Sequence, residues 1–527
     1  MPMQDPSVTP ATPWTPSRRR LLWSGALGAA ALGTLSPGPA SAGTSRAGTT
    51  GHGPVRGPFT LGVASGDPLP DRVVLWTRLA PEPLAEDGSG GMPNRPVPVH
   101  WEISEDETFR RIVARGMELA RPEEAHSVHV DASGLQPRTT YFYRFRTGAE
   151  LSPVGRTKTA PRPTDRLDRF SFAFASCQNY PAGFYTAYRH LAAEDLDLVA
   201  FLGDYLYTGD GQGTIGRGYV PVREVQTLPD YRVRLAQVKS DADLQAAHAA
   251  FPWLMTFDDH EVANNWAGTD VDPNVPVDEF LARRAAGFQA YYEHMPVRRA
   301  QRPSGADIQF YRRLTFGDLV DFYLLDTRQY RSDQVGPARR YEPGRTMLGD
   351  VQEKWLTDAL AGPTARWNVL AQQVVFSQRD FTVGPEQGFN DDSWDNYPIA
   401  RDRLRDQLAR AGNPVVLTGD VHMNYVSDIT ADFDDPTAAV VGTELVGTSI
   451  SSGGDSDPNA AGDARQLAEN PHLKFINRER GYVRNVVTPA GWTADFRTVD
   501  YVSRPGAPVR TRASFRIDDG RPGARRV

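Results

Sequence analysis

The chain has 527 residues, of which 40% are hydrophobic and one is cysteine, and its formal net charge is −7. This length exceeds one ordinary domain, so we expect two domains with substantial hydrophobic cores. The acidic balance argues against sequence-independent nucleic-acid binding, which relies on lysine and arginine to neutralise phosphates; no sequence-specific nucleic-acid binding is expected either. A single cysteine excludes a disulfide framework.

Residues 1–42 have the order of segments found in an export signal. Arg18, Arg19 and Arg20 precede a weakly apolar stretch rich in glycine and alanine, and Ala40-Ser41-Ala42 follows as a small-residue cleavage site. The stretch is too short and too glycine-rich to span a bilayer. The paired arginines resemble a twin-arginine signal, which is read by an export machinery that carries folded proteins. A disordered basic tail is the weaker alternative.

Removal of residues 1–42, which contain three arginines and one aspartate, would change the net charge from −7 to −9. No other long apolar run occurs in the sequence. We therefore expect an acidic protein that the twin-arginine machinery exports, secreted or held in the cell envelope, without stable membrane insertion.

Residues 43–58 are rich in glycine, threonine, serine and proline, and we expect a flexible leader there. From 59 to 158 the chain consists of short alternating runs separated by turn residues, a pattern typical of β-strands. The clearest runs are 73–77, 97–103, 127–130 and 141–146. This spacing predicts a small all-β, fibronectin-like sandwich domain with a structural or docking role.

Residues 159–168 are rich in proline and charge and predict a linker to a second domain, 169–527. In that domain apolar runs alternate with helical patterns, which indicates an α/β fold with buried strands. The helical patterns cover 182–193, 278–294, 350–361 and 399–411. Late apolar runs at 440–454, 482–488 and 513–517 would complete a second sheet.

Four apolar runs of the second domain end in side chains that can bind a metal. These side chains are Cys177; Asp204 and Tyr207; Asp258, Asp259, His260 and Glu261; and Asp420 and His422. Ligands of α/β sheets bind at the carboxyl ends of the strands, so the four ends can face one site. Each end also has a structural explanation, such as a buried inert thiol, a capping carboxylate or a packed ring. Their coincidence favours a metal site.

The donor types of this set imply one transition metal. Cys177, Tyr207 and His422 supply a thiolate, a phenolate and an imidazole, which suit Fe³⁺. The lone thiol of an exported chain is then explained as a metal ligand. Asp204 could bridge the Fe³⁺ to a second metal.

The second position would have only oxygen ligands, from Asp258, Asp259 or Asp420. Such a site favours Ca²⁺, Mg²⁺ or Mn²⁺. Two adjacent metals activate a water, orient it in line with the leaving group and neutralise the charge that develops during phosphate-ester hydrolysis. His260 could hydrogen-bond a ligand or the phosphate, or have only a structural role.

The sequence resembles the PhoD-like alkaline phosphatases (the alkaline phosphatase D family), within the wider calcineurin-like and purple-acid-phosphatase group of metallophosphoesterases. The resemblance covers nearly all of the chain after residue 58. It is carried by the motifs G-V-A-S-G-D-P (62–68), V-L-W-T-R-L (74–79), F-A-S-C-Q (174–178), L-G-D-Y-L-Y (202–207), F-D-D-H-E (257–261), L-D-T-R-Q-Y-R (325–331), D-S-W-D-N-Y-P (392–398), T-G-D-V-H (418–422) and E-L-V-G-T-S-I-S-S (444–452).

The resemblance implies a four-layer metallophosphoesterase-like β-sandwich flanked by helices. It also implies Fe³⁺ on Cys177, Asp204, Tyr207 and His422, and two Ca²⁺ ions at or near Asp258, Asp259 and Asp420. The wider group carries Gly-Asn-His-Asp/Glu and Gly-His-x-His motifs. This chain has Asp-Asp-His-Glu at 258–261 and Gly-Asp-Val-His at 419–422. A carboxylate replaces a neutral ligand in each motif, which favours Ca²⁺ over a second transition metal.

We therefore expect an exported phosphoesterase that hydrolyses phosphate monoesters, diesters or both through a metal-activated water, with Asp204 and His260 as its catalytic residues. A phospholipase D-type diesterase on the same scaffold is an alternative, and an exported binding protein with structural metals is an alternative of another class. Trp394, Asp395 and Tyr397 would either line the substrate entrance or have a structural role. No nucleotide-binding P-loop follows the glycines of 209–218.

Overall fold

The computed structural model describes residues 57–456 and 462–527. The predicted signal peptide, 1–42, and nearly all of the predicted leader, 43–58, lie outside the described residues. Within the described ranges, none of the helices has both the length and the apolar character needed to cross a membrane.

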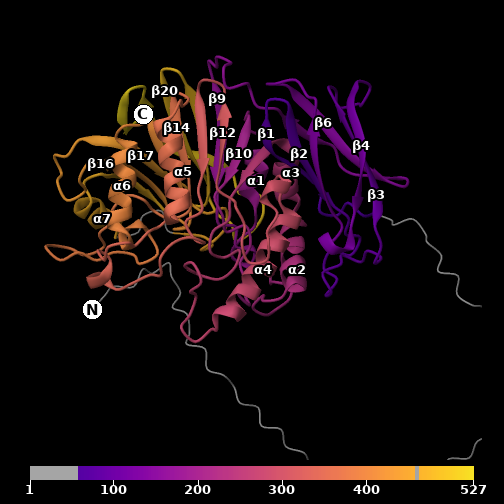
Figure 1. Ribbon diagram of the computed structural model, residues 1–527, viewed down its shortest axis with the longest axis horizontal. Coiled ribbons are helices and arrows are strands. Elements are labelled where there is room, and N and C mark those ends of the chain that lie inside the picture. Colours follow the sequence, from indigo (N-terminus) through magenta and orange to yellow (C-terminus); the bar gives the residue numbers. More distant parts are fainter. Residues whose placement is uncertain (1–56, 457–461) are drawn as a thin grey trace, which may run out of the picture. The chain divides into compact units, whose positions relative to one another are not determined.

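A ten-stranded mixed sheet extends through both predicted domains (Figure 1). Its strands, in spatial order, are β22 (Arg521–Arg526), β21 (Val509–Asp518), β20 (Gly491–Val499), β19 (Gly481–Thr488), β9 (Phe170–Ala175), β10 (Leu198–Phe201), β11 (Pro252–Met255), β1 (Val63–Leu69), β2 (Arg72–Arg78) and β5 (Ser127–Ser133). Strands β9, β10 and β11 pair in parallel, and β11 pairs in parallel with β1. Parallel strands buried on both faces favour continuous apolar runs, as β10 and β11 have.

A seven-stranded sheet packs against one face of this sheet. Its order is β12 (Arg312–Phe316), β13 (Val320–Leu324), β14 (Trp367–Ala371), β15 (Pro414–Thr418), β17 (Val440–Val446), β16 (Asn424–Thr430) and β18 (Leu473–Asn477). The core between the two sheets is rich in aromatic rings. Phe172 of β9 contacts Phe322 of β13 edge to face, with ring centroids 5.1 Å apart.

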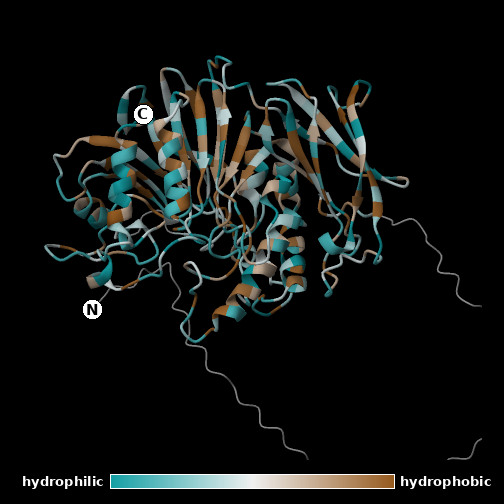
Figure 2. Cartoon of the chain, in the orientation of Figure 1, coloured by the Kyte–Doolittle hydropathy of each residue, from teal (hydrophilic) through white to brown (hydrophobic). Residues whose placement is uncertain are grey.

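Helices cover the outer faces of the two sheets. Four pack on the ten-stranded sheet: α1 (Thr186–Ala192), α2 (Leu228–Lys239), α3 (Ala242–Ala250) and α4 (Val277–His294). Two pack on the seven-stranded sheet, α5 (Gly349–Ala361) and α6 (Pro398–Leu408), and a short α7 (Asp463–Glu469) precedes β18. Figure 2 shows hydrophobic residues concentrated on the strands and hydrophilic residues on the visible sides of α5 and α6. The predicted four-layer fold flanked by helices is confirmed.

The amino-terminal region is all-β, as predicted, and its two halves belong to different sheets. A five-stranded sheet contains β4 (Ile112–Ala120), β3 (Val97–Ser104), β6 (Thr140–Thr147), β7 (Glu150–Leu151) and β8 (Gly155–Lys158). It shares a core with β1, β2 and β5, which belong to the ten-stranded sheet. The amino-terminal region therefore shares the ten-stranded sheet with the second domain, because β1 pairs with β11. The predicted linker at 159–168 does not interrupt that sheet.

Candidate metal centre

The predicted ligands follow the carboxyl ends of four strands. Cys177 follows β9, Asp204 and Tyr207 follow β10, and Asp258 lies in the loop after β11. These three strands are neighbours in the ten-stranded sheet. The fourth end, after β15 of the seven-stranded sheet, carries Asp420 and His422. The site therefore joins the two sheets.

The backbone of the candidate ligands is unusual. Cys177, Asp204, Asp420 and His422 have φ values of 60°, 59°, 63° and 54°. Left-handed φ values are uncommon for residues other than glycine and concentrate at functional sites, where the surrounding structure maintains them. Gly203 supports this geometry, because a Cβ there would lie 2.4 Å from the Cβ of Asp258.

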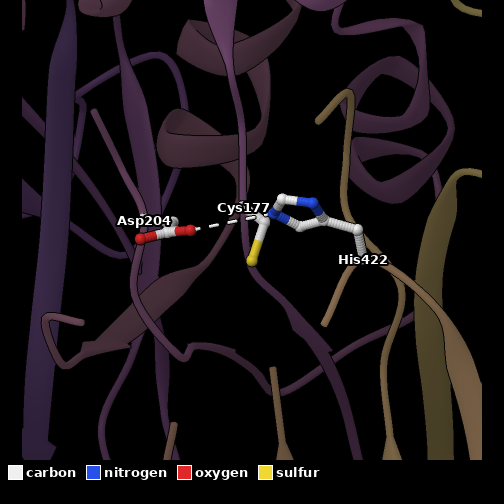
Figure 3. A group of neighbouring side chains, drawn as sticks. All are labelled: Cys177, Asp204 and His422. Carbon is white, nitrogen blue, oxygen red and sulfur yellow. Dashed lines mark ion pairs between the residues drawn. The ribbon is translucent and has the colours of Figure 1, made fainter. Parts of the chain in front are cut away.

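The four predicted iron ligands lie together. Cys177, Asp204 and His422 each offer a donor atom, and these atoms lie within 4.8 Å of one another (Figure 3). The Tyr207 hydroxyl donates to Asp204 Oδ2 at 2.7 Å and lies 3.0 Å from His422 Nε2. A thiol, a carboxylate, a phenol and an imidazole thus face one point.

Two further groups extend the site away from Cys177. Donor atoms of Asp258, Asp259 and Asp420 lie within 4.8 Å of one another, and so do those of Asp204, Asp259 and His260. Asp258 Oδ2 and Asp259 Oδ1 are buried and have no hydrogen-bond partner. Arg328 lies 3.8 Å from Asp259 Oδ1, beyond hydrogen-bond distance. Buried carboxylate oxygens are normally hydrogen-bonded, so these two oxygens fit a bound cation.

His260 lies beside Asp204, a candidate iron ligand, and Asp259, a member of the all-carboxylate group. Its ring packs on the ring of Tyr207 with centroids 4.1 Å apart, and its backbone N–H donates to Asp204 Oδ1 at 3.3 Å. Its Nδ1 is buried without a hydrogen-bond partner. Burial lowers the pKa of His260 below its ordinary value, so the neutral imidazole is favoured.

The electrostatics of the cluster favour a cation. Burial, followed by the charges of Asp259 and Asp258, raises the pKa of Asp204 well above its ordinary value. Burial and the neighbouring carboxylates likewise raise the pKa of Asp420, and burial raises that of Asp258 to about 7. Burial and Asp204 raise the pKa of the Cys177 thiol. A bound cation reverses these shifts by stabilising the charged forms.

Arg328 is a functional residue that sequence reasoning did not single out. Its guanidinium is fully buried, and its Nε donates to Asp258 Oδ1 at 2.5 Å. Its other nitrogens donate to Asp392 Oδ1 at 2.7 Å and Asp420 Oδ1 at 3.4 Å. Arg331 shares Asp392 at 2.6 Å. Both arginines lie in the motif at 325–331, but no local signal distinguishes them from other arginines.

Glu261, which the sequence offered among the possible ligands at this strand end, contacts backbone N–H groups. Its carboxylate accepts the backbone N–H groups of Asp204 at 3.1 Å, Tyr205 at 2.5 Å and Asp258 at 2.8 Å. One buried side chain therefore fixes the loops after β10 and β11 relative to each other.

Three other side chains hold the loops that carry Tyr207 and His422. Arg234 of α2 donates to the backbone carbonyls of Tyr207 at 2.5 Å and Gly209 at 3.0 Å. Arg480, whose pKa burial lowers to about 10, donates to the carbonyl of His422. The Ser452 hydroxyl oxygen lies 2.7 Å from the Tyr207 hydroxyl oxygen.

The aromatic loop after Asp392 does not line an entrance. Trp394 and Tyr397 are buried in the core beneath α5 and α6. The Trp394 indole N–H donates to Gln372 Oε1 at 3.1 Å, and the Tyr397 hydroxyl donates to the carbonyl of Ser332 at 2.7 Å. The structural alternative therefore holds for these rings, and Asp392 is the residue of this motif that reaches the site.

Comparison with known proteins gives two family matches and close relatives. The model of the PhoD-like phosphatase matches residues 172–496, and that of its N-terminal domain matches residues 44–161. Alkaline phosphatase D of Bacillus subtilis (strain 168) is 51% identical over 483 residues, which cover 89% of this chain and 82% of that protein. A solved structure of PhoD is 50% identical with a TM-score of 0.86, and the match covers 89% of this chain and 92% of that one. This chain is a phosphoric ester hydrolase and belongs to the PhoD-like phosphatase family.

Proposed function

We propose that this protein is an exported phosphoesterase that depends on Fe³⁺ and two Ca²⁺ ions and hydrolyses phosphate monoesters, diesters or both. The observation that carries the proposal is the overlap of the three donor groups, which share Asp204 and Asp259. Donor groups that overlap through shared carboxylates can hold adjacent metal ions.

In this proposal Cys177, Asp204, Tyr207 and His422 hold Fe³⁺. Three of these donors can be anionic, and a trivalent ion of the transition series is the cation that best compensates a buried thiolate, phenolate and carboxylate together. The raised pKa of the Cys177 thiol supports the need for a strongly charged cation.

Asp258, Asp259 and Asp420 hold Ca²⁺, because this group offers oxygen atoms alone. Asp204 lies in the iron group and in a second group with Asp259 and His260, so it would serve both kinds of metal. When bound, the metals lower the pKa of a water and neutralise the charge that develops on the phosphate.

The protein's own side chains would divide the remaining tasks. Asp204 belongs to two of the three donor groups, and Glu261 fixes its backbone. His260, neutral because it is buried, can exchange a proton or a hydrogen bond with the phosphate through a ring nitrogen. Arg328 compensates the charge of Asp258 and Asp420.

The test is turnover on matched phosphate monoesters and diesters, including a phosphatidyl diester, with the metal-loaded protein lacking residues 1–42. We expect hydrolysis that EGTA abolishes and added Ca²⁺ restores. Preference for the phosphatidyl diester would instead favour the phospholipase D-type alternative, and turnover indifferent to chelators would contradict the calcium assignment. Export by the twin-arginine route is tested separately by replacing Arg18 and Arg19 with lysine and following the protein outside the cytoplasm.

A further inference from the structure

The Ser452 hydroxyl contacts two parts of the proposed iron site. Its Oγ lies 2.7 Å from the phenol oxygen of Tyr207 and 2.8 Å from the backbone carbonyl oxygen of Cys177. The side chain is 1% exposed, and its Oγ accepts the backbone N–H of Asn179 at 3.0 Å. Ser452 is therefore fixed against the oxygen of one candidate ligand and the backbone of another.

A serine hydroxyl has one proton, so Ser452 can donate to only one of these two acceptors at a time. While Tyr207 is a neutral phenol, its own proton is donated to Asp204 Oδ2. As a metal ligand, Tyr207 is a phenolate that has no proton to donate and can only accept. Hydrogen bonds to a charged oxygen are stronger than those to a neutral carbonyl. The Ser452 hydroxyl therefore donates to Tyr207 when Tyr207 is a phenolate.

The Cys177 carbonyl does not lose all its donors when this happens. The backbone N–H groups of Ser451 and Ser452 both lie 3.4 Å from the same carbonyl oxygen. The rotation of one hydroxyl group therefore leaves no buried acceptor without a partner, and the loop need not move.

We propose that Ser452 donates a hydrogen bond to the metal-binding oxygen of Tyr207 and so sets how strongly that oxygen donates electrons to the metal. The inference rests on the proposed Fe³⁺ site. Ser452 acts through Tyr207 and is a positioning residue. A hydrogen bond to a ligating atom withdraws electron density from it, which is how groups around the ligands adjust a metal.

The test is the visible absorption spectrum of the iron-loaded protein, because charge transfer from phenolate to Fe³⁺ gives a band whose energy follows the donor strength of the phenolate. Ser452→Ala should raise the energy of the phenolate electrons and move the band to longer wavelength, by on the order of 10–30 nm for one hydrogen bond to a charged group. Ser452→Thr, which keeps the hydroxyl, should restore the wild-type position.

Ser451→Ala is the matched control. Ser451 is equally buried in the same loop, but its hydroxyl donates to the carbonyl of Asn179 at 2.8 Å. The absorption band of the Ser451→Ala protein should stay at the wild-type position. A second measurement needs no variant: the phenolate C–O stretch in the resonance Raman spectrum of wild-type protein should shift on exchange into D₂O.

The outcomes separate this inference from the proposed function. An iron-loaded Ser452→Ala protein with an unmoved band, or a C–O stretch insensitive to D₂O, would overturn the role of Ser452 and leave the iron site standing. A wild-type protein that contains iron but has no phenolate band would overturn the iron site, and this inference with it.

Discussion

The carboxylate of Glu261 accepts the backbone N–H of Asp204, which belongs to two of the three donor groups, at 3.1 Å. It also accepts the backbone N–H of Asp258 at 2.8 Å. Glu261, which binds no metal in the proposal, thus sets the distance between Asp204 and Asp258, which do. This relationship explains why the motif at 257–261 ends in a buried glutamate.

We expect Glu261→Gln to lower metal content as well as stability. The amide NH₂ would face backbone donors, and each donor left unpaired costs about 1–3 kcal/mol. Unfolding in urea should show a loss of about 2–4 kcal/mol, and elemental analysis should show reduced iron and calcium. Glu444→Gln is the control, because Glu444 is buried and accepts the N–H groups of Phe376 and Ser377, which are not candidate ligands. Equal metal loss in both variants would contradict the role of Glu261.

Asp204→Asn and Asp420→Asn should have different effects on metal content. Asp204 belongs to groups on both sides of the site, whereas Asp420 belongs only to the all-carboxylate group. Elemental analysis should therefore show that Asp204→Asn loses both iron and calcium and that Asp420→Asn loses mainly calcium. Turnover of Asp204→Asn should fall more than about 100-fold, which exceeds the loss typical for a residue that only hydrogen-bonds a metal ligand. Retention of both metals by Asp204→Asn would exclude a bridging role.

Arg328→Met should make folding dependent on calcium. Removing one partner of a buried ion pair costs about 3–5 kcal/mol, and Arg328 contacts Asp258, Asp392 and Asp420. Urea unfolding with EGTA should show this loss, and excess Ca²⁺ should recover part of it by supplying positive charge. Arg331→Met is the comparison, because Arg331 pairs only with Asp392 among the acidic side chains of the described residues. If calcium rescued both variants equally, Arg328 would not be the counter-cation of the site.

Lys239 should give the protein a stability that rises with pH. Its amine is buried in α2, 4.2 Å from the Trp76 ring centroid, and burial lowers its pKa to about 7. The unfolded chain binds the proton up to a pKa of 10.5. Between pH 7 and 10.5 the unfolded state therefore holds more protons, and the free energy of unfolding rises with pH.

Lys239→Met removes this dependence. At pH 7 it should raise the free energy of unfolding by roughly 2–4 kcal/mol, since about 1.4 kcal/mol per pKa unit is partly offset by the lost contact between the cation and the rings. The gain should shrink towards zero by pH 10. The control is Lys354→Met, at an exposed position in α5. Urea unfolding at both pH values measures the difference, and a gain that is the same at pH 7 and pH 10 would contradict a buried charged amine.

Local sequence predicted the ends of strands well. Cys177, Asp204, Asp258 and His422 stand where apolar runs stop, and the hydrophobic period places each run in a buried strand. Because ligands of α/β sheets gather at the carboxyl ends of strands, the convergence of these residues could be expected before the structure.

Pairings between distant segments could not be predicted in this way. The parallel contact of β1 with β11 joins Ser65 to Pro252, and nothing within either segment specifies its partner. The roles of Arg328, Glu261 and Ser452 were missed for the same reason. Each acts through a contact with a residue at least 56 positions away. Each lies in a motif that carries the family resemblance, but nothing in the motif specifies that distant partner.

The visible absorption spectrum of active protein, recorded with its iron content and its turnover in the same preparation, tests the central claim most directly. We predict a coloured protein with a phenolate-to-Fe³⁺ band, and a Cys177→Ala variant in which iron, colour and turnover decrease together. A colourless, iron-free preparation with full activity would contradict the account.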